Sequence, residues 1–373
     1  MRKDPSYQTQ FFGCSNLPVD SSKKANQDQA AREGVIEAIA EAMDLFPEDK
    51  ALVMRCTYTL SGVILFNREN GLKAGKLGCL NHTLHTYMHN MEDPEVMSLG
   101  GAIGAYFDYV DENRRIAAEL GGIQAIIQNI RNRFHGQYAE WEYNPVKQSL
   151  FALSSGCWLN QDICFEEGFP ELAVALMAEH GEEIKIAEET QQVTKALMAK
   201  SDMYRERLAD LGVTDSMVHV MQVNPHDRGA LDLTCENFAV LVGPHNVGGP
   251  SGASFKDFNK TIQSKALESG ALEEIMKVVM GGQEMHHNEH GAFNFDVDAA
   301  YNVNKDCFFA LAHLGNENPE AQAAMLAAGL PDAVEADLHK PPKDSNEVNA
   351  GCLLLKEMDA AAVLAAGLTN VCH

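Results

Sequence analysis

His286, Glu289 and His290 are the residues of this chain whose types and spacing are the best candidates for catalysis. They stand in the stretch MHHNEHG as His-x-x-Glu-His, which is the spacing of an inverted zinc-protease motif. In such a motif two imidazoles hold the zinc ion and the carboxylate activates a bound water. The pattern therefore raises the hypothesis of a metal-dependent hydrolase.

The elements that would have to position this motif argue against a zinc site. The segment 281–298 lies between a helix predicted to end near Met280 and another predicted to start near Ala299, and Gly281, Gly282 and Gly291 bracket the motif. A zinc site needs both imidazoles on one face of a real helix and a third ligand nearby. We interpret the segment as a solvated insertion loop, with adventitious binding of a transition metal as the alternative, and predict no metal and no cofactor.

A second stretch, GPHNVGGPSGASFK at residues 243–256, is rich in glycine as phosphate-binding loops are. No strand is predicted before it and no Gly-Lys-Ser/Thr follows it, so the phosphate-binding motif is incomplete. The prolines and glycines are typical of a flexible linker. Since the chain also has no Gly-x-Ser-x-Gly motif, we predict that the protein is not an enzyme.

Composition limits the classes of partner. The chain has 373 residues, 45% of them hydrophobic, which is enough for a large core. Its 53 acidic and 29 basic side chains give a formal charge of -24, which repels nucleic acid and anionic lipid and favours basic protein segments. No segment offers the roughly 18 uninterrupted apolar residues of a membrane-spanning helix. The expected partner is another protein, bound through a basic or amphipathic segment, without nucleic acid or membrane insertion.

The cysteines predict the compartment. The chain has nine, without a Cys-x-x-Cys pair, and most stand in apolar runs. An odd number of scattered cysteines is typical of unpaired core residues in a reducing compartment. We therefore expect a cytoplasmic protein, with a cytoskeletal, ciliary or nuclear location as alternatives.

Glycine recurs along the chain in one local pattern, an alanine-rich turn followed by glycine and an apolar helix. The pattern is centred on Gly34, Gly78, Gly121, Gly168, Gly212, Gly270, Gly329 and Gly367. Four of the seven intervals fall close to the roughly 40 to 47 residues of two- or three-helix repeats. The two long intervals require insertions.

The third unit shows the internal order of a repeat. ENRRIAAEL predicts a short helix, Gly121 and Gly122 a sharp turn, IQAIIQNIRN a second helix and PVKQSLFALSSGCWL a third. The pattern Asn-x-x-x-Ala-x-x-x-Gly-Gly-Ile-x-x-Ile resembles the armadillo repeat, and the resemblance covers about residues 25 to 373. A two-helix HEAT-type array is the alternative.

The resemblance implies an all-α fold, a right-handed α-solenoid of about seven armadillo-like three-helix repeats plus a partial C-terminal repeat. We expect residues 1–24 to form an irregular N-terminal extension and residues 25–373 to form the solenoid. Insertion loops are expected at about 131–144, 243–257 and 281–298.

In the armadillo family the third helices line a concave groove, and importin alpha proteins carry Trp and, four residues later, Asn on successive third helices to hold an extended basic peptide. The resemblance places the matching pairs here at Tyr58 with Gly62, Gly100 with Gly104, Phe151 with Ser155, Leu233 with Asn237, and Phe309 with His313. Only Asn237 keeps the amide, so the importin mode of peptide binding is not expected.

The expected function is a non-enzymatic protein-binding scaffold or adaptor that uses the groove and the edge loops. A structural component of a large assembly such as a ciliary axoneme is the first alternative, and the hydrolase with His286, Glu289 and His290 is the second. The candidate partner-binding residues are the groove residues Tyr58, Phe151, Asn237, Phe309 and His313, the loop aromatics Tyr138 and Trp141, and the acidic residues Asp108 and Glu236. The same acidic set includes Asp111, Glu188 and Glu189.

Overall fold

The computed structural model of the chain describes residues 4–16, 23–133, 145–244, 260–281, 303–338 and 345–358, and all regular structure in these ranges is helical. The chain divides into two compact units, unit 1 (Met1–Phe169) and unit 2 (Pro170–His373). No helix within the described ranges is long and apolar enough to cross a membrane.

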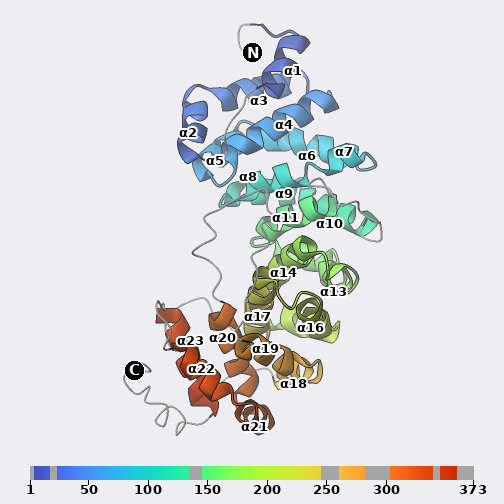
Figure 1. Cartoon of the computed structure of the whole chain (residues 1–373). Coiled ribbons are helices and arrows are strands. Elements are labelled where there is room, and N and C mark those ends of the chain that lie inside the picture. The colour runs from blue at the N-terminus through green and yellow to red at the C-terminus, as the bar shows by residue number, and fades with distance from the viewer. Residues whose placement is uncertain are drawn as a thin grey trace. The chain divides into compact units, whose positions relative to one another are not determined.

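The helices of the described residues form seven three-helix repeats. These repeats follow one another along the chain (Figure 1). The first helices are α2 (Lys24–Arg32), α5 (Arg68–Lys76), α9 (Asp111–Glu119), α12 (Gln161–Glu166), α15 (Asp202–Asp210), α18 (Lys260–Glu268) and α21 (Pro319–Ala327). The second helices are α3 (Val35–Leu45), α6 (Cys79–His89), α10 (Gly122–Arg133), α13 (Phe169–His180), α16 (Val213–Val223), α19 (Ala271–Met280) and α22 (Leu330–Leu338). The third helices are α4 (Lys50–Ile64), α7 (Pro94–Met97) with α8 (Gly100–Phe107), α11 (Pro145–Gly156), α14 (Ile184–Met198), α17 (Arg228–Val242), α20 (Val303–Gly315) and α23 (Ser345–Met358).

The turn between the first and second helix of each repeat has the backbone conformation that the sequence predicts. All seven glycines that precede a second helix have a positive φ: Gly34, Gly78, Gly121, Gly168, Gly212, Gly270 and Gly329. This left-handed region is open to glycine and strained for residues with a β-carbon. The repeat prediction is therefore confirmed at the level of single residues.

Buried amides join each repeat to the next in unit 1. Asn113 of α9 is 1% exposed and donates from Nδ2 to the carbonyl oxygens of Tyr106, at 2.8 Å, and Gly71, at 3.0 Å. Asn70 of α5 makes the same kind of bond to the carbonyl oxygen of Val63, at 3.0 Å. A first helix thus completes the hydrogen bonding of the third helix that precedes it, which carbonyls at a helix end require.

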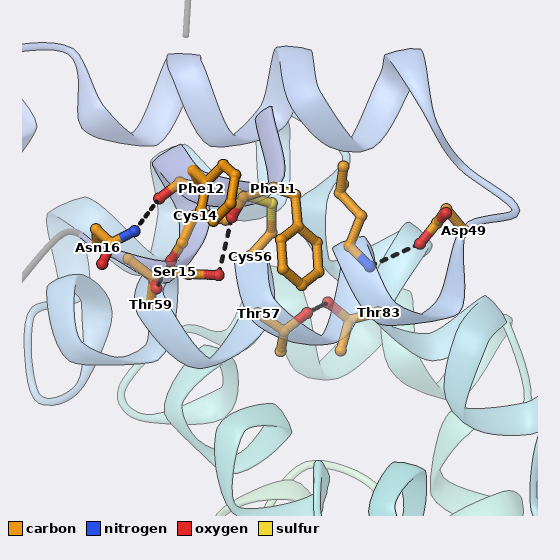
Figure 2. The surroundings of a disulfide bond; sticks show 11 residues. Phe11, Phe12, Cys14, Ser15, Asn16, Asp49, Cys56, Thr57, Thr59 and Thr83 are labelled. Carbon is orange, nitrogen blue, oxygen red and sulfur yellow. Dashed lines mark hydrogen bonds between the residues drawn. A yellow bond between two sulfur atoms is a disulfide. The ribbon is translucent and has the colours of Figure 1, made fainter. Parts of the chain in front are cut away.

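The N-terminal segment corrects one expectation. Residues within 1–24 were expected to be irregular, but α1 (Tyr7–Ser15) is a helix that packs against α4. Figure 2 shows the disulfide between Cys14 and Cys56 that joins these two helices. The Thr59 hydroxyl also donates to the Cys14 carbonyl oxygen. The helix forms although its own sequence is weakly amphipathic, because tertiary contacts with α4 outweigh local propensity.

The cysteines contradict the sequence interpretation. Besides the bond of Figure 2, disulfides join Cys157 to Cys164 and Cys235 to Cys307, and Cys352 is disulfide-bonded as well. Cys79 is free and buried, and burial raises the pKa of its thiol to about 12, so it is an unreactive core residue. The expectation of unpaired core cysteines is therefore wrong for the disulfide-bonded residues, and the argument for a reducing compartment does not hold.

Candidate functional site

The third helices of unit 1 place two of the predicted groove residues beside small partners. Tyr58 on α4 is half-buried, and its hydroxyl lies 2.5 Å from the Ser98 hydroxyl oxygen. Phe151 on α11 is half-buried with its ring against Gly104 of α8, where an added β-carbon would lie 2.6 Å from the ring. The expected pair Gly100 and Gly104 thus serves the close packing of α8 on α11.

Asp108 does not contribute an exposed charge to a groove. It follows α8, is 7% exposed, and accepts a 2.8 Å hydrogen bond from the Ser155 hydroxyl. Burial raises the pKa of its carboxyl above the usual value. The prediction that Asp108 supplies negative potential at the surface is therefore wrong, because the end of α8 turns inward onto α11.

Two of the other expected acidic residues, Asp111 and Glu188, form ion pairs within their own helices. Asp111 lies at the start of a first helix, where Arg114 approaches it at 3.1 Å. Glu188 on α14 bonds Lys185 at 2.6 Å. Glu189 is half-buried on the same helix.

In unit 2 two of the three predicted groove residues, Asn237 and His313, are buried. Asn237 on α17 is fully buried and donates from Nδ2 to the Leu233 carbonyl oxygen of its own helix at 2.8 Å. The structure shows no hydrogen-bond partner for its buried Oδ1 atom among the described residues. His313 on α20 is 2% exposed, and desolvation lowers its pKa to about 4. Phe309 is half-buried and stacks on the His313 ring with 6.4 Å between centroids.

Charged side chains gather on the third helices α14, α17 and α20. Lys195 of α14 bonds Glu236 of α17 at 2.8 Å, and Lys305 lies 3.4 Å from the carboxylate of Asp306 on α20. Asp232 of α17 is 7% exposed. We call Asp232, Glu236 and Asp306, with Lys195 and Lys305, the carboxylate cluster.

The carboxyls of this cluster influence one another. Burial, followed by the negative charges of Asp306 and Glu236, raises the pKa of Asp232 to about 7, against the opposing effect of Lys305 and Arg228. Burial also raises the pKa of Asp306 above its usual range, although Lys305 and Lys195 oppose the rise. Like charges brought together in a poorly solvated place each disfavour the ionised form of the other.

Two features hold the carboxylate cluster in place. The disulfide between Cys235 and Cys307 joins α17 to α20, with 4.7 Å between the Cα atoms, and its cysteines stand one residue before Glu236 and one after Asp306. Gly229, three residues before Asp232 on α17, leaves room for Glu188 of α14, whose Oε1 lies 2.5 Å from where a β-carbon would be. Small residues and a covalent bond therefore bring charged groups of three helices together.

Of the predicted site residues, the structure places Glu236 in this cluster, and sequence reasoning missed Asp232, Asp306, Lys195 and Lys305. The available signal was a set of charges inside otherwise apolar runs, DLTCENF on α17 and KDCFF on α20. Tyr138 and Trp141 lie outside the described residues, as do His286, Glu289 and His290. Within the described part of the chain, no group of three or more His, Cys, Asp or Glu side chains could hold a metal ion.

Comparison with known proteins addresses the fold. No family model matches the sequence, and no curated protein does. Among solved structures, an engineered protein from a structural genomics consortium aligns over 96% of this chain and 77% of its own, with a TM-score of 0.69 and 14% identity. A designed armadillo repeat protein aligns over 74% of this chain and 100% of its own, with a TM-score of 0.53 and 15% identity.

A third structure comes from a study of a phosphorylation switch in the interaction between cadherin and beta-catenin. It aligns over 93% of this chain and 73% of its own, with a TM-score of 0.57 and 13% identity. At these identities the likeness concerns the fold. Together with the seven glycine turns and the stacked third helices, it identifies the chain as an all-α protein with an armadillo-like solenoid fold.

Proposed function

We propose that the protein is a non-enzymatic scaffold that binds a segment of another protein along its third helices. One observation carries the proposal: the carboxylate cluster brings buried and half-buried charges together on three third helices. Buried like charges destabilise a fold, so packing alone gives no reason for them. A basic partner does, because it would neutralise the excess negative charge.

A solved structure of similar fold supports the proposal that the partner is another protein. The cadherin and beta-catenin study concerns an interaction between two proteins. The acid excess of the whole chain also favours a basic or mixed-charge segment over nucleic acid. The proposed contact residues of unit 2 are Phe309, Glu236 and His313, and those of unit 1, considered by itself, are Tyr58 and Phe151. Tyr138 and Trp141, which lie outside the described residues, remain candidate contacts from the sequence. Asn237 would offer its unpaired carbonyl oxygen after a small local opening.

A site-specific crosslinking experiment tests this function. A photoreactive p-benzoylphenylalanine at Phe309, on α20, should capture a protein partner in native extract. The matched control carries the same group at Met203, which is 59% exposed on the first helix α15. Capture of one defined protein from Phe309 and not from Met203 supports the proposal. Equal capture from both positions, or none from Phe309, would contradict it.

A further inference from the structure

The carboxylate cluster has one more carboxylate than it has lysines. Lys195 bonds Glu236, and Lys305 lies beside Asp306. Asp232 is left with a buried Oδ1 atom that has no hydrogen-bond partner among the described residues, although the side chain is only 7% exposed. Buried polar atoms are usually bonded, and an exception calls for an explanation such as a missing ligand.

The missing group must be a donor and is best a cation. Asp232 offers only acceptor atoms when ionised, and its ionised form is disfavoured first by burial and then by the negative charges of Asp306 and Glu236. A neutral donor would satisfy the unpaired oxygen but would leave the two carboxyls repelling each other. A positive group removes both problems at once.

The presence of two aspartates on two joined helices favours a group with several donors. The cluster is spread over α17 and α20, which the disulfide between Cys235 and Cys307 holds together, and Glu236 remains partly exposed with 39% of its side chain accessible. A guanidinium carries five N–H donors in one plane and can bridge two carboxylates, whereas an ammonium acts as a point charge.

We propose that the carboxylate cluster is a binding site for one arginine side chain of a partner protein, held between Asp232 and Asp306. The inference rests on the proposed function, since it names the chemical group by which the partner is recognised.

Binding of arginine should depend on pH. The charged groups acting on the two aspartates are Lys195 of α14, Arg228 and Glu236 of α17, and Lys305 of α20. Because the pKa of Asp232 is raised to about 7, its carboxyl is largely protonated at pH 5.5 and largely ionised at pH 8. Arginine requires the ionised form, so its affinity should rise with pH across this interval.

The test uses the full chain and fluorescent dodecapeptides of alanine and serine that contain one arginine, one lysine, or one citrulline. Citrulline keeps the shape of arginine and lacks its charge. At pH 8 we expect the arginine peptide to bind about tenfold more tightly than the citrulline peptide by fluorescence anisotropy, with lysine between them. At pH 5.5 the preference should shrink toward equal binding.

Variants separate the site from the net charge of the protein. Asp232→Asn and Asp306→Asn should each remove most of the arginine preference at pH 8. Asp210→Asn is the matched control, because it removes the same charge from the first helix α15, where Asp210 pairs with Lys265. The control should change the preference less than about twofold.

Lack of arginine preference at pH 8 overturns the inference, whether both peptides bind or neither does. An equal effect of Asp210→Asn and Asp232→Asn also overturns it, since general attraction would then explain the binding. If an asparagine variant does not fold, the wild-type comparison of arginine with citrulline at two pH values still decides. If a partner is captured at Phe309 but the arginine peptide is not preferred, the proposed function stands and this arginine site is rejected. If the arginine peptide is preferred but no partner is captured, the arginine site stands and the proposed function is rejected.

Discussion

Successive third helices meet mainly through small residues in unit 1, where α8 brings a single buried carboxyl, Asp108, against α11, and through several charged residues in unit 2. In unit 1, α8 approaches α11 so closely that a β-carbon on Gly100 would lie 2.8 Å from backbone atoms of Gln148 and Ser149. In unit 2, α14, α17 and α20 bring together the carboxylate cluster. The same stacking is thus achieved with two chemistries, so a cluster of charges is not needed for stacking itself. This contrast is the reason for assigning recognition to the charged layer.

The largest expected effect concerns two disulfides, one from each of the two units. The bond between Cys235 and Cys307 in unit 2 closes 72 residues, and the bond between Cys157 and Cys164 in unit 1 closes 7. Loop-closure entropy predicts that paired serine replacement lowers the free energy of unfolding by about 4 kcal/mol for the first and about 2 kcal/mol for the second. Urea denaturation of both double variants measures which loss of unfolding free energy is larger. A larger loss for the Cys157 and Cys164 variant would mean that chain entropy does not dominate.

The next effect tests close packing in unit 1. Gly100→Ala should destabilise the protein by about 1–3 kcal/mol, because its β-carbon meets backbone that has little freedom to move. The control is Gly101→Ala on the same helix, where the nearest atom is the end of the Gln148 side chain. That side chain can rotate away, so the control should be milder. Equal losses of melting temperature for Gly100→Ala and Gly101→Ala would contradict the close backbone packing assigned to unit 1.

A smaller effect, of opposite sign, tests the charged layer of unit 2. The folded pKa of Asp232 is raised from 3.8 to about 7, so wild-type stability should fall as pH rises from about 4 to about 7. Asp232→Asn removes this loss, and its melting temperature should exceed that of wild type at pH 8 by about 2–4 °C for each kcal/mol gained. The difference should vanish near pH 4.

Asp210→Asn is the control for the direction of the stability change that is expected of Asp232→Asn. The hydrogen bond and charge of Lys265 lower the pKa of Asp210, so its contribution is present at neutral pH and is lost on acidification. The control variant should therefore be no more stable than wild type at pH 8. Stabilisation by both variants would point to overall charge and away from the cluster.

The smallest effect belongs to an ordinary surface ion pair. Arg207 and Glu171 bond across neighbouring repeats of unit 2, but about half of each side chain is exposed, at 49% and 47%. Arg207→Gln should change the free energy of unfolding by less than about 1 kcal/mol. Chemical denaturation with and without added salt would show whether this exposed pair responds to salt differently from the buried cluster. A loss of unfolding free energy as large as that of Gly100→Ala would contradict its description as an ordinary surface ion pair.

The sequence predicted those features whose cause is local. A turn that requires a positive φ selects glycine, so its position can be recognised in the sequence. At Gly78, Gly121 and Gly329 an added β-carbon would meet no atom within 4 Å, so the backbone conformation alone explains the glycine. The repeat order and the three-helix unit followed from these positions.

Features that depend on distant contacts were missed. Cys14 and Cys56 are 42 residues apart, and only the packing of α1 on α4 shows that they pair. Asp108 and Asp232 both stand in or beside apolar helices, and sequence spacing does not tell which helix face turns inward. The carboxylate cluster draws its members from three repeats, so its composition depends on how those repeats are aligned.

The buried amides between repeats determine where the chain can be shortened. Because Asn113 of α9 satisfies the Tyr106 carbonyl of α8, a fragment that ends at Phe107 leaves that carbonyl exposed at a bare helix end. A fragment that ends at Glu119 keeps the amide and closes the preceding repeat. Stable truncations should therefore stop after a first helix, one helix beyond the boundary that the repeat pattern alone indicates, and expression of the two fragments would show whether a repeat is complete without its successor.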